Sequence, residues 1–347
     1  MNNLLNKIKS NNYTKNDLIE ALSLNSDEAV SLFSLSDKIR KDYCGEKVQI
    51  RGLLEISNIC ARNCNYCGVR ANNDLVQRYK MPIEEIYSIA LDMDKKGVKT
   101  LVMQGGESKT YNPFDLADLI REIKSNTDMA VTLSLGEHSF ETYKLWKEAG
   151  ANRYLLRHET ANKEHYKYLH PDGVLDTRLE CLRNLKKLGY QTGVGCMVGS
   201  PGQKTEYLAE DLEFIRDFKP EMVGIGPYVM HEHTPFKGEP NGDVFLTLKM
   251  LALVRIITKT ALMPATTALA TIGNEGYKKG LSVGCDVIMI NFTPQKYKIL
   301  YEIYPGKKCI SENTDTILST IKDLIISCNR QVSIDQGHAR NIIKNQK

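Results

Sequence analysis

Eight apolar, β-branched runs alternate with longer helical patterns along this chain of 347 residues. The runs lie at 47–57, 100–106, 130–136, 153–159, 191–199, 222–228, 263–268 and 287–293. Several are nearly continuous in apolar residues, as expected of parallel strands that are buried on both faces. Helical patterns lie at 82–97, 113–125, 139–149, 176–188, 205–218, 243–259, 275–283 and 314–327. This alternation predicts an α/β fold, a single TIM-type (β/α)8 barrel.

A doubly wound open sheet is the structural alternative, because it is built from the same strand–helix units. No low-complexity tract, short repeat or Gly/Ser linker divides the sequence. A chain of this size buries roughly 75% of its open-chain surface, which is enough for a large core. We therefore expect a barrel at 47–310, an N-terminal helical extension at 1–46, and a C-terminal helix and tail at 311–347. Residues 2–43 are predicted to form two or three short polar helices packed across one end of the barrel.

Composition argues against two classes of protein. The net charge is only +4 with both signs interspersed, which is unlike a dedicated nucleic-acid binder. No run approaches the roughly 18 apolar residues that are needed to cross a bilayer. The N-terminus, MNNLLNKIKSNNYTKND, is polar and lacks the apolar core of a signal peptide. We expect a cytoplasmic chain with no nucleic-acid or membrane partner.

Three of the nine cysteines lie close together directly after the first predicted strand. Cys60, Cys64 and Cys67 occupy the segment ICARNCNYCG, in a loop that opens on the C-terminal face of a barrel, where active sites lie. Three thiolates can hold three corners of a 4Fe–4S cluster, whereas ordinary electron-transfer clusters take four cysteines. The missing fourth ligand leaves one iron open to the amino and carboxylate groups of a methionine moiety. We therefore predict a catalytic cluster at this loop.

Two other uses of these cysteines are less consistent with their spacing. A structural zinc site needs a second Cys or His pair at typical spacing, but Cys44 precedes the segment by sixteen residues and His138 is distant. A thioredoxin-like pair, Cys64 and Cys67, would lie at a helix start without a third cysteine. The remaining cysteines in apolar contexts are expected to be inert packing residues; they are Cys181, Cys196, Cys285 and Cys328.

Glycines and tyrosines follow several later strands. The second strand ends in MQGGE, where Gly-Gly forms a tight turn and also lets the backbone approach a ligand closely. The fifth, QTGVGCMVGSPGQ, has glycines that usually mark close backbone approach. Tyr301 and Tyr304 follow the eighth strand and either cover an adenosyl group or pack within a helix.

The fourth strand ends in four polar residues, RHET, which are hard to bury without partners. Strand alternation places Arg157 and Glu159 on one face and His158 on the other. A cation and an anion that both face the barrel mouth suit a zwitterionic ligand, and an internal Arg157–Glu159 ion pair is the alternative. Arg178 begins the next helical pattern, from which it can reach the same mouth.

The spacing Cys-x3-Cys-x2-Cys, with Tyr66 before the third cysteine, resembles the radical S-adenosylmethionine (SAM) superfamily. In that superfamily the segment that matches Gln104, Gly105, Gly106 and Glu107 lies against the methionine amino group of SAM. The segments TLSLGE, LLRHETAN, MVGSPGQ, MVGIGP, HTP, PATTA and YPGKKC are similar, more narrowly, to the HydE-type maturase of FeFe-hydrogenase. This narrower resemblance covers about residues 47–310.

The resemblance implies a role for each matched residue. Cys60, Cys64 and Cys67 would ligate the cluster. The positions that surround SAM in the family match Tyr66, Ser134, Glu159, Arg178, Met197 and Tyr304. The positions that face the deeper cavity, where the substrate is thought to lie, match Arg157, Thr132, Thr266, Thr267 and Tyr301.

The resemblance also implies an activity and its partners. Such enzymes are oxygen-sensitive, take an electron from a donor, and generate a 5′-deoxyadenosyl radical. They act on a small iron–dicarbonyl–cyanide–cysteine precursor that a tyrosine-cleaving sister maturase delivers. The product leads towards the diiron subcluster of the hydrogenase, which a GTPase maturase then carries.

One departure from the family and two alternatives remain open. Some members have three further cysteines near the C-terminus for a second cluster, but here only Cys309 matches and the next cysteine is Cys328, so we predict one cluster. Another small-molecule radical SAM enzyme, such as methylornithine synthase or biotin synthase, would share the barrel and the cluster. A non-catalytic iron–sulfur or zinc protein is the alternative of a different class. His231 and His233 receive no role.

Overall fold

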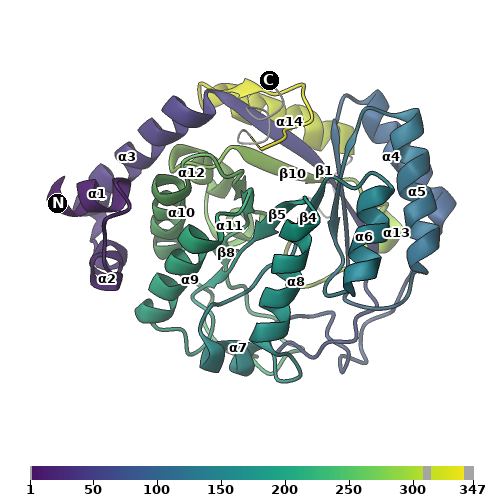
Figure 1. Ribbon diagram of the computed structural model, residues 1–347, viewed down its shortest axis with the longest axis horizontal. Coiled ribbons are helices and arrows are strands. Elements are labelled where there is room, and N and C mark those ends of the chain that lie inside the picture. The colour runs from purple at the N-terminus through teal and green to yellow at the C-terminus, as the bar shows by residue number, and fades with distance from the viewer. Residues whose placement is uncertain (1, 308–313, 340–347) are drawn as a thin grey trace.

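Parallel strands surround the centre of the molecule in a computed structural model that describes residues 2–307 and 314–339 (Figure 1). Their order is β7–β5–β4–β3–β2–β1–β10–β9. A bridge between Met222 in β7 and Leu262, just before β9, joins the two edges of the sheet. The strands are β1 (Lys47–Ser57), β2 (Thr100–Gly105), β3 (Ala130–Ser134), β4 (Arg153–Leu155), β5 (Gln191–Val194), β7 (Met222–Val223), β9 (Pro264–Ala265) and β10 (Val287–Asn291). The predicted barrel is confirmed, and the open-sheet alternative is wrong.

Helices cover the outside of the barrel, and their starts follow local capping chemistry. Asn112 accepts a hydrogen bond from Phe114 N and precedes Pro113 at the first helical position, where proline loses no intrahelical bond. The helices that the sequence predicted are α4 (Ile83–Lys95), α5 (Pro113–Asn126), α6 (Phe140–Glu148), α8 (Leu175–Lys187), α9 (Thr205–Phe218), α10 (Val244–Thr258), α12 (Gly276–Ser282) and α14 (Thr314–Ser327). The short helices α7 (Lys163–Leu169), α11 (Thr267–Ile272) and α13 (Gln295–Lys298) were not predicted.

Several strands end earlier than the apolar runs suggested. β4 stops at Leu155, and Glu159 has a φ of 64°, a left-handed conformation that ends regular strand geometry. The fifth and sixth apolar runs are each interrupted at a glycine: β5 ends before Gly195, and β7 ends before Gly224. Their ends, β6 (Met197–Val198) and β8 (Gly226–Pro227), pair in a separate sheet. A Cβ on Gly195 would lie 2.0 Å from Gly224 O, so the two backbones approach too closely for any side chain there.

The N-terminal helices lie mainly along the side of the barrel rather than across its end. α1 (Asn2–Lys9) and α2 (Lys15–Ser23) pack against α10 and α9 (Figure 1). α3 (Ser26–Cys44) runs along α10, and only its later part reaches the loops at the barrel end, where Ser36 Oγ donates to Val283 O. The expected placement therefore holds for the end of α3 alone.

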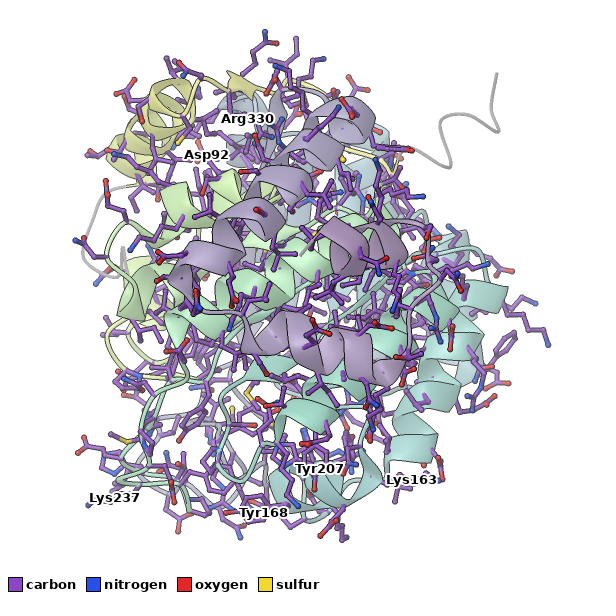
Figure 2. All side chains as sticks on the ribbon, turned by 90° about the vertical axis from the view of Figure 1, so that its left-hand side faces the viewer. Asp92, Lys163, Tyr168, Tyr207, Lys237 and Arg330 are labelled. Carbon is purple, nitrogen blue, oxygen red and sulfur yellow. The ribbon has the colours of Figure 1, made fainter. Side chains whose placement is uncertain are left out.

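The C-terminal segment covers the end of the barrel where the strands begin. β11 (Gln331–Val332) pairs with the start of β1, and Gln336 O accepts from Arg153 and Thr100. The strand-to-helix loops open at the opposite end, and Figure 2 shows Tyr168 and Lys237 there, far from Arg330. Within residues 2–307 and 314–339, no helix has the length and apolar character of a membrane span.

Candidate active site

A cavity of about 320 Å³ opens at the carboxyl ends of the barrel strands. Its wall draws residues from the cysteine loop, from the strand ends and from the segment after β10. The structure brings most of the predicted site residues to this wall: Tyr66, Cys67, Gln104, Gly105, Glu107, Ser134, Arg157, Glu159, Arg178, Met197, Thr266, Thr267, Tyr301 and Tyr304. Thr132, Gly106, Cys60 and Cys64 do not line it.

The three cysteines of the loop are all reduced and partly buried. The loop is held to the barrel, because Ala61 N donates to Glu107 O at 2.8 Å. Burial raises the pKa of Cys67 to about 12, and the neighbouring Cys60 adds to that rise. Thiols that are costly to ionise alone become good ligands once a bound cation offsets their charge. The donor set, three neighbouring thiols at a cavity, therefore suits an iron–sulfur cluster.

Gly106 supports this loop instead of facing the cavity. A Cβ at this position would lie 2.3 Å from Ile59 O and 2.8 Å from Cys60 Cβ, so only glycine fits. Gly105 lies at the cavity wall. The double glycine thus lets the end of β2 approach both the cysteine loop and the cavity.

Four alternating charges connect the cysteine loop with the strand ends. Arg62 contacts Glu107 and lies 3.0 Å from Glu137, while Arg178 lies 2.8 Å from Glu137 and 3.4 Å from Glu107. Burial raises the pKa of Glu137. Arg62 and Glu137 were not predicted from the sequence, because their partners lie far along the chain. Glu107 was predicted to lie against the methionine amino group of SAM and Arg178 to surround SAM; here the two side chains contact each other.

Arg157 and Glu159 form an ion pair at the cavity wall. Arg157 Nη2 lies 3.0 Å from Glu159 Oε2, but neither atom makes an aligned hydrogen bond to any residue that the structure describes. Both are buried, so their hydrogen-bonding capacity is available to a ligand. The alternative of an internal ion pair is therefore present in the structure, and it leaves a cation and an anion side by side facing the cavity.

His158 does not line the cavity, and its hydrogen bonds hold the polar segment after β4 in place. Its Nδ1 accepts from Gly195 N at 3.3 Å, so Nε2 carries the proton and donates to Asp211 at 3.2 Å. The same Asp211 oxygen accepts from Ala161 N at 2.6 Å. Cys196 completes a fully buried group of three potential ion ligands. Because hydrogen bonds already engage both imidazole nitrogens, we assign this group a structural role.

A second buried ion pair lies deeper in the mouth of the barrel. Lys307 Nζ contacts the Glu55 carboxylate and donates to Tyr301 O at 3.2 Å. Glu55 also accepts from Asn291, and Gln104 Nε2 donates to the Tyr301 hydroxyl at 3.2 Å. Glu55 and Lys307 were missed, because Glu55 lies within an apolar run and the partner of Lys307 lies far away in the sequence.

Thr132 lies one layer further down. It lines a smaller cavity of about 20 Å³ together with Arg51. Within the described part of the chain, the Thr132 hydroxyl and two of the Arg51 nitrogens have no hydrogen-bond partner, and burial lowers the pKa of Arg51 to about 10. Leu155 and Met289 border both cavities, so Thr132 is separated from the larger one by a single layer of side chains.

Comparisons with known proteins identify the family. Residues 54–215 match the Radical SAM superfamily. The chain is 45% identical, over 344 residues and 98% of both proteins, to the FeFe-hydrogenase maturase subunit HydE of Thermotoga maritima. This chain belongs to the HydE family. A more distant relative, 3-methylornithine synthase of Methanosarcina barkeri, is 27% identical over 79% of this chain and 78% of that protein.

Solved structures share the barrel fold of this chain. Methylornithine synthase (PylB) superimposes with a TM-score of 0.83 at 24% identity, covering 95% of this chain and 97% of that one. The hydrogenase maturase HydG gives 0.80 at 20% identity, covering 96% and 75%. As a HydE-family member, the protein is a radical SAM enzyme and a hydrogenase maturase. The family implies a 4Fe–4S cluster and SAM, so the non-catalytic alternative is wrong, and so is assignment to methylornithine or biotin synthase.

Proposed function

We propose that this enzyme binds its 4Fe–4S cluster through Cys60, Cys64 and Cys67 and acts on a small iron–carbonyl–cyanide–cysteine precursor during assembly of the FeFe-hydrogenase H-cluster. The observation that carries this proposal is the reduced cysteine loop beside a cavity whose wall holds the Arg157–Glu159 charge pair. The 45% identity to a HydE maturase over nearly the whole chain supports the choice of substrate.

The upper part of the cavity would bind SAM. Tyr66, Ser134, Met197 and Tyr304 would surround its adenosyl and methionine parts, and all four line the cavity. The cluster, when bound, supplies the electron for reductive cleavage of SAM. The chain contributes orientation, because the backbone at Gly105 allows a ligand to approach the end of β2 closely.

Glu107 and Arg178 would hold the SAM end of the cavity in shape. Their ion pairs with Arg62 and Glu137 connect the cysteine loop to β2, to the loop after β3 and to α8. These partners leave each charge partly neutralised, so a zwitterionic ligand could be accepted without an unpaired buried charge. Gln104 is engaged with Tyr301 and would link the SAM part of the cavity to its deeper part.

The deeper part would hold the substrate. Arg157, Thr266, Thr267 and Tyr301 line the cavity, and two buried nitrogens of Arg157 have no hydrogen-bond partner among the described residues. A guanidinium fork suits an anionic iron complex or the carboxylate of its cysteine. Glu159 would then lie between the two ligands, paired with Arg157 and facing SAM. Thr132 would contribute from the layer beneath.

The proposed partners follow from this chemistry. A tyrosine-cleaving maturase would deliver the precursor, a GTPase maturase would receive the product, and an electron donor would reduce the cluster, all in the cytoplasm. The enclosed walls of the cavity would exclude water while a reactive carbon radical is present.

In-vitro maturation with Arg157→Ala tests the substrate assignment. The parent should activate apo-hydrogenase in the presence of the other maturases, and the variant should lose activation at least tenfold while still forming 5′-deoxyadenosine from SAM. Arg183→Ala is the control, because Arg183 is exposed on α8 and pairs only with Glu180 among the described residues. Normal hydrogenase activation by Arg157→Ala would contradict the assignment of this residue to the substrate.

A further inference from the structure

A histidine that the sequence did not single out touches one of the three cysteines. His170 follows α7, and its Nδ1 lies 3.2 Å from Cys64 Sγ. Its Nε2 lies 3.3 Å from the hydroxyl of Tyr66, which lines the cavity. The side chain is therefore in contact both with a proposed cluster ligand and with a residue of the proposed SAM site.

The ring is fixed on several sides. His170 stacks on Tyr166 at 4.5 Å with an angle of 20° between the rings, and Tyr66 meets it edge-on at 5.4 Å. Its backbone N donates to Tyr166 O at 2.8 Å, and only 3% of the residue is exposed. The cysteine loop is held at the same place, since Asn65 N donates to Leu169 O at 2.9 Å. Both partners of the His170–Cys64 contact are therefore held in place by contacts with other residues.

The direction of the hydrogen bonds follows from ligand chemistry. A thiolate that is bound to iron carries no proton and can only accept, so His170 Nδ1 must donate to Cys64. A neutral imidazole carries one proton, so when Nδ1 donates, Nε2 is free to accept. Nε2 then accepts from the Tyr66 hydroxyl, and Tyr66 selects the tautomer that donates to sulfur.

We propose that His170 is a positioning residue that donates a hydrogen bond to the Cys64 thiolate and thereby raises the reduction potential of the cluster. This inference rests on the proposed function, in which Cys64 ligates the cluster. Reduction adds one electron, with no proton transferred, to a cluster whose sulfurs already carry negative charge. A donor at sulfur stabilises the reduced state more than the oxidised state, so cluster reduction becomes easier.

Three substitutions separate the hydrogen bond from packing. His170→Phe keeps the ring stack but removes both nitrogens, whereas His170→Asn keeps a donor close to the position of Nδ1. His170→Gln places its amide nitrogen near the Nε2 position, away from Cys64. His165→Asn is the matched control, because His165 is also buried, lies on α7, and bonds Ser200 instead of a cysteine.

The measurement is an EPR-monitored redox titration of each reconstituted protein without SAM, alongside iron and sulfide content. At a fixed potential, His170→Phe and His170→Gln should each show about a tenfold lower ratio of reduced to oxidised cluster, or about 59 mV for one electron. His170→Asn and His165→Asn should match the parent.

Each outcome decides a separate claim. If the parent assembles no 4Fe–4S cluster, the proposed function fails, and the role of His170 fails with it. If all variants assemble the cluster and their potentials equal that of the parent, the proposed function stands and the role of His170 is overturned. Should His170→Phe fail to load iron, the comparison of His170→Gln with His170→Asn decides, and equal potentials for these two overturn the role.

Discussion

Replacing Asp211 by alanine should destabilise the enzyme from a position outside its cavity. Asp211 is fully buried on α9 and accepts hydrogen bonds from His158 Nε2 and from Ala161 N. The substitution leaves both donors buried without an acceptor. Each orphaned buried group costs about 1–3 kcal/mol, so the expected loss is about 2–6 kcal/mol.

Asparagine at the same position provides the matched comparison. Asp211→Asn keeps an oxygen acceptor of the same shape, but hydrogen bonds to a neutral acceptor are about half as strong as those to a carboxylate. We expect a cost of no more than about 2 kcal/mol. Asp176→Ala should stay within about 0.5 kcal/mol of the parent, because the Asp176–Lys163 pair is exposed.

Denaturant unfolding can be followed through Trp146, the single tryptophan of the chain, which is buried against the barrel. We also expect Asp211→Ala to weaken SAM binding, because the Asp211–His158 contact holds the segment that carries Arg157 and Glu159. A cost below about 1 kcal/mol for Asp211→Ala would refute the reasoning. Equal destabilisation by Asp211→Asn and Asp211→Ala would refute the reasoning as well, since the oxygen that asparagine retains would then contribute nothing to stability.

Three further predictions concern other parts of the molecule. Lys307→Met leaves the Glu55 carboxylate buried without its cation and should lower the free energy of unfolding by about 3–5 kcal/mol, whereas Glu55→Gln/Lys307→Met should recover most of that loss. Burial lowers the pKa of His165 to about 4, below its unfolded value of about 6.5. The unfolded state therefore binds more protons, and the free energy of unfolding should fall as the pH drops from 6.5 towards 4. His165→Asn should make the free energy of unfolding less dependent on pH in this range, and an unchanged dependence would contradict the role given to His165. Cys309 lies outside the described residues, and the prediction of one cluster is tested by iron analysis: Cys309→Ala should retain about four irons per chain, and about eight in the parent would contradict it.

The order of the barrel elements could be predicted because each buried parallel strand leaves a continuous apolar run, and each outer helix leaves a periodic one. The ends of the strands could not. The turn at Glu159 requires a left-handed backbone that the contact between His158 and Asp211 supports from 53 positions away. The residues near Glu159 do not indicate this distant contact, so the run at 153–159 was predicted as one strand.

The site was predictable where residue type and spacing carry the chemistry. The three cysteines and the polar end of the fourth run are visible in this way, and Cys67, Arg157 and Glu159 indeed line one cavity. Contacts between distant segments were invisible: His170 meets Cys64 across 106 positions, and Arg62 meets Glu137 across 75. The cysteine loop reaches the residue after α7 only once the barrel has folded.

The central claim, that the cysteine loop holds a cluster that cleaves SAM, is tested most directly by measuring 5′-deoxyadenosine after anaerobic incubation of the reconstituted enzyme with SAM and dithionite. We expect 5′-deoxyadenosine from the parent and none from Cys64→Ser, whose Trp146 fluorescence should remain native because Cys64 lies in a loop outside the barrel core. A parent protein that holds iron but forms no 5′-deoxyadenosine would contradict the claim, as would a Cys64→Ser variant that forms as much as the parent.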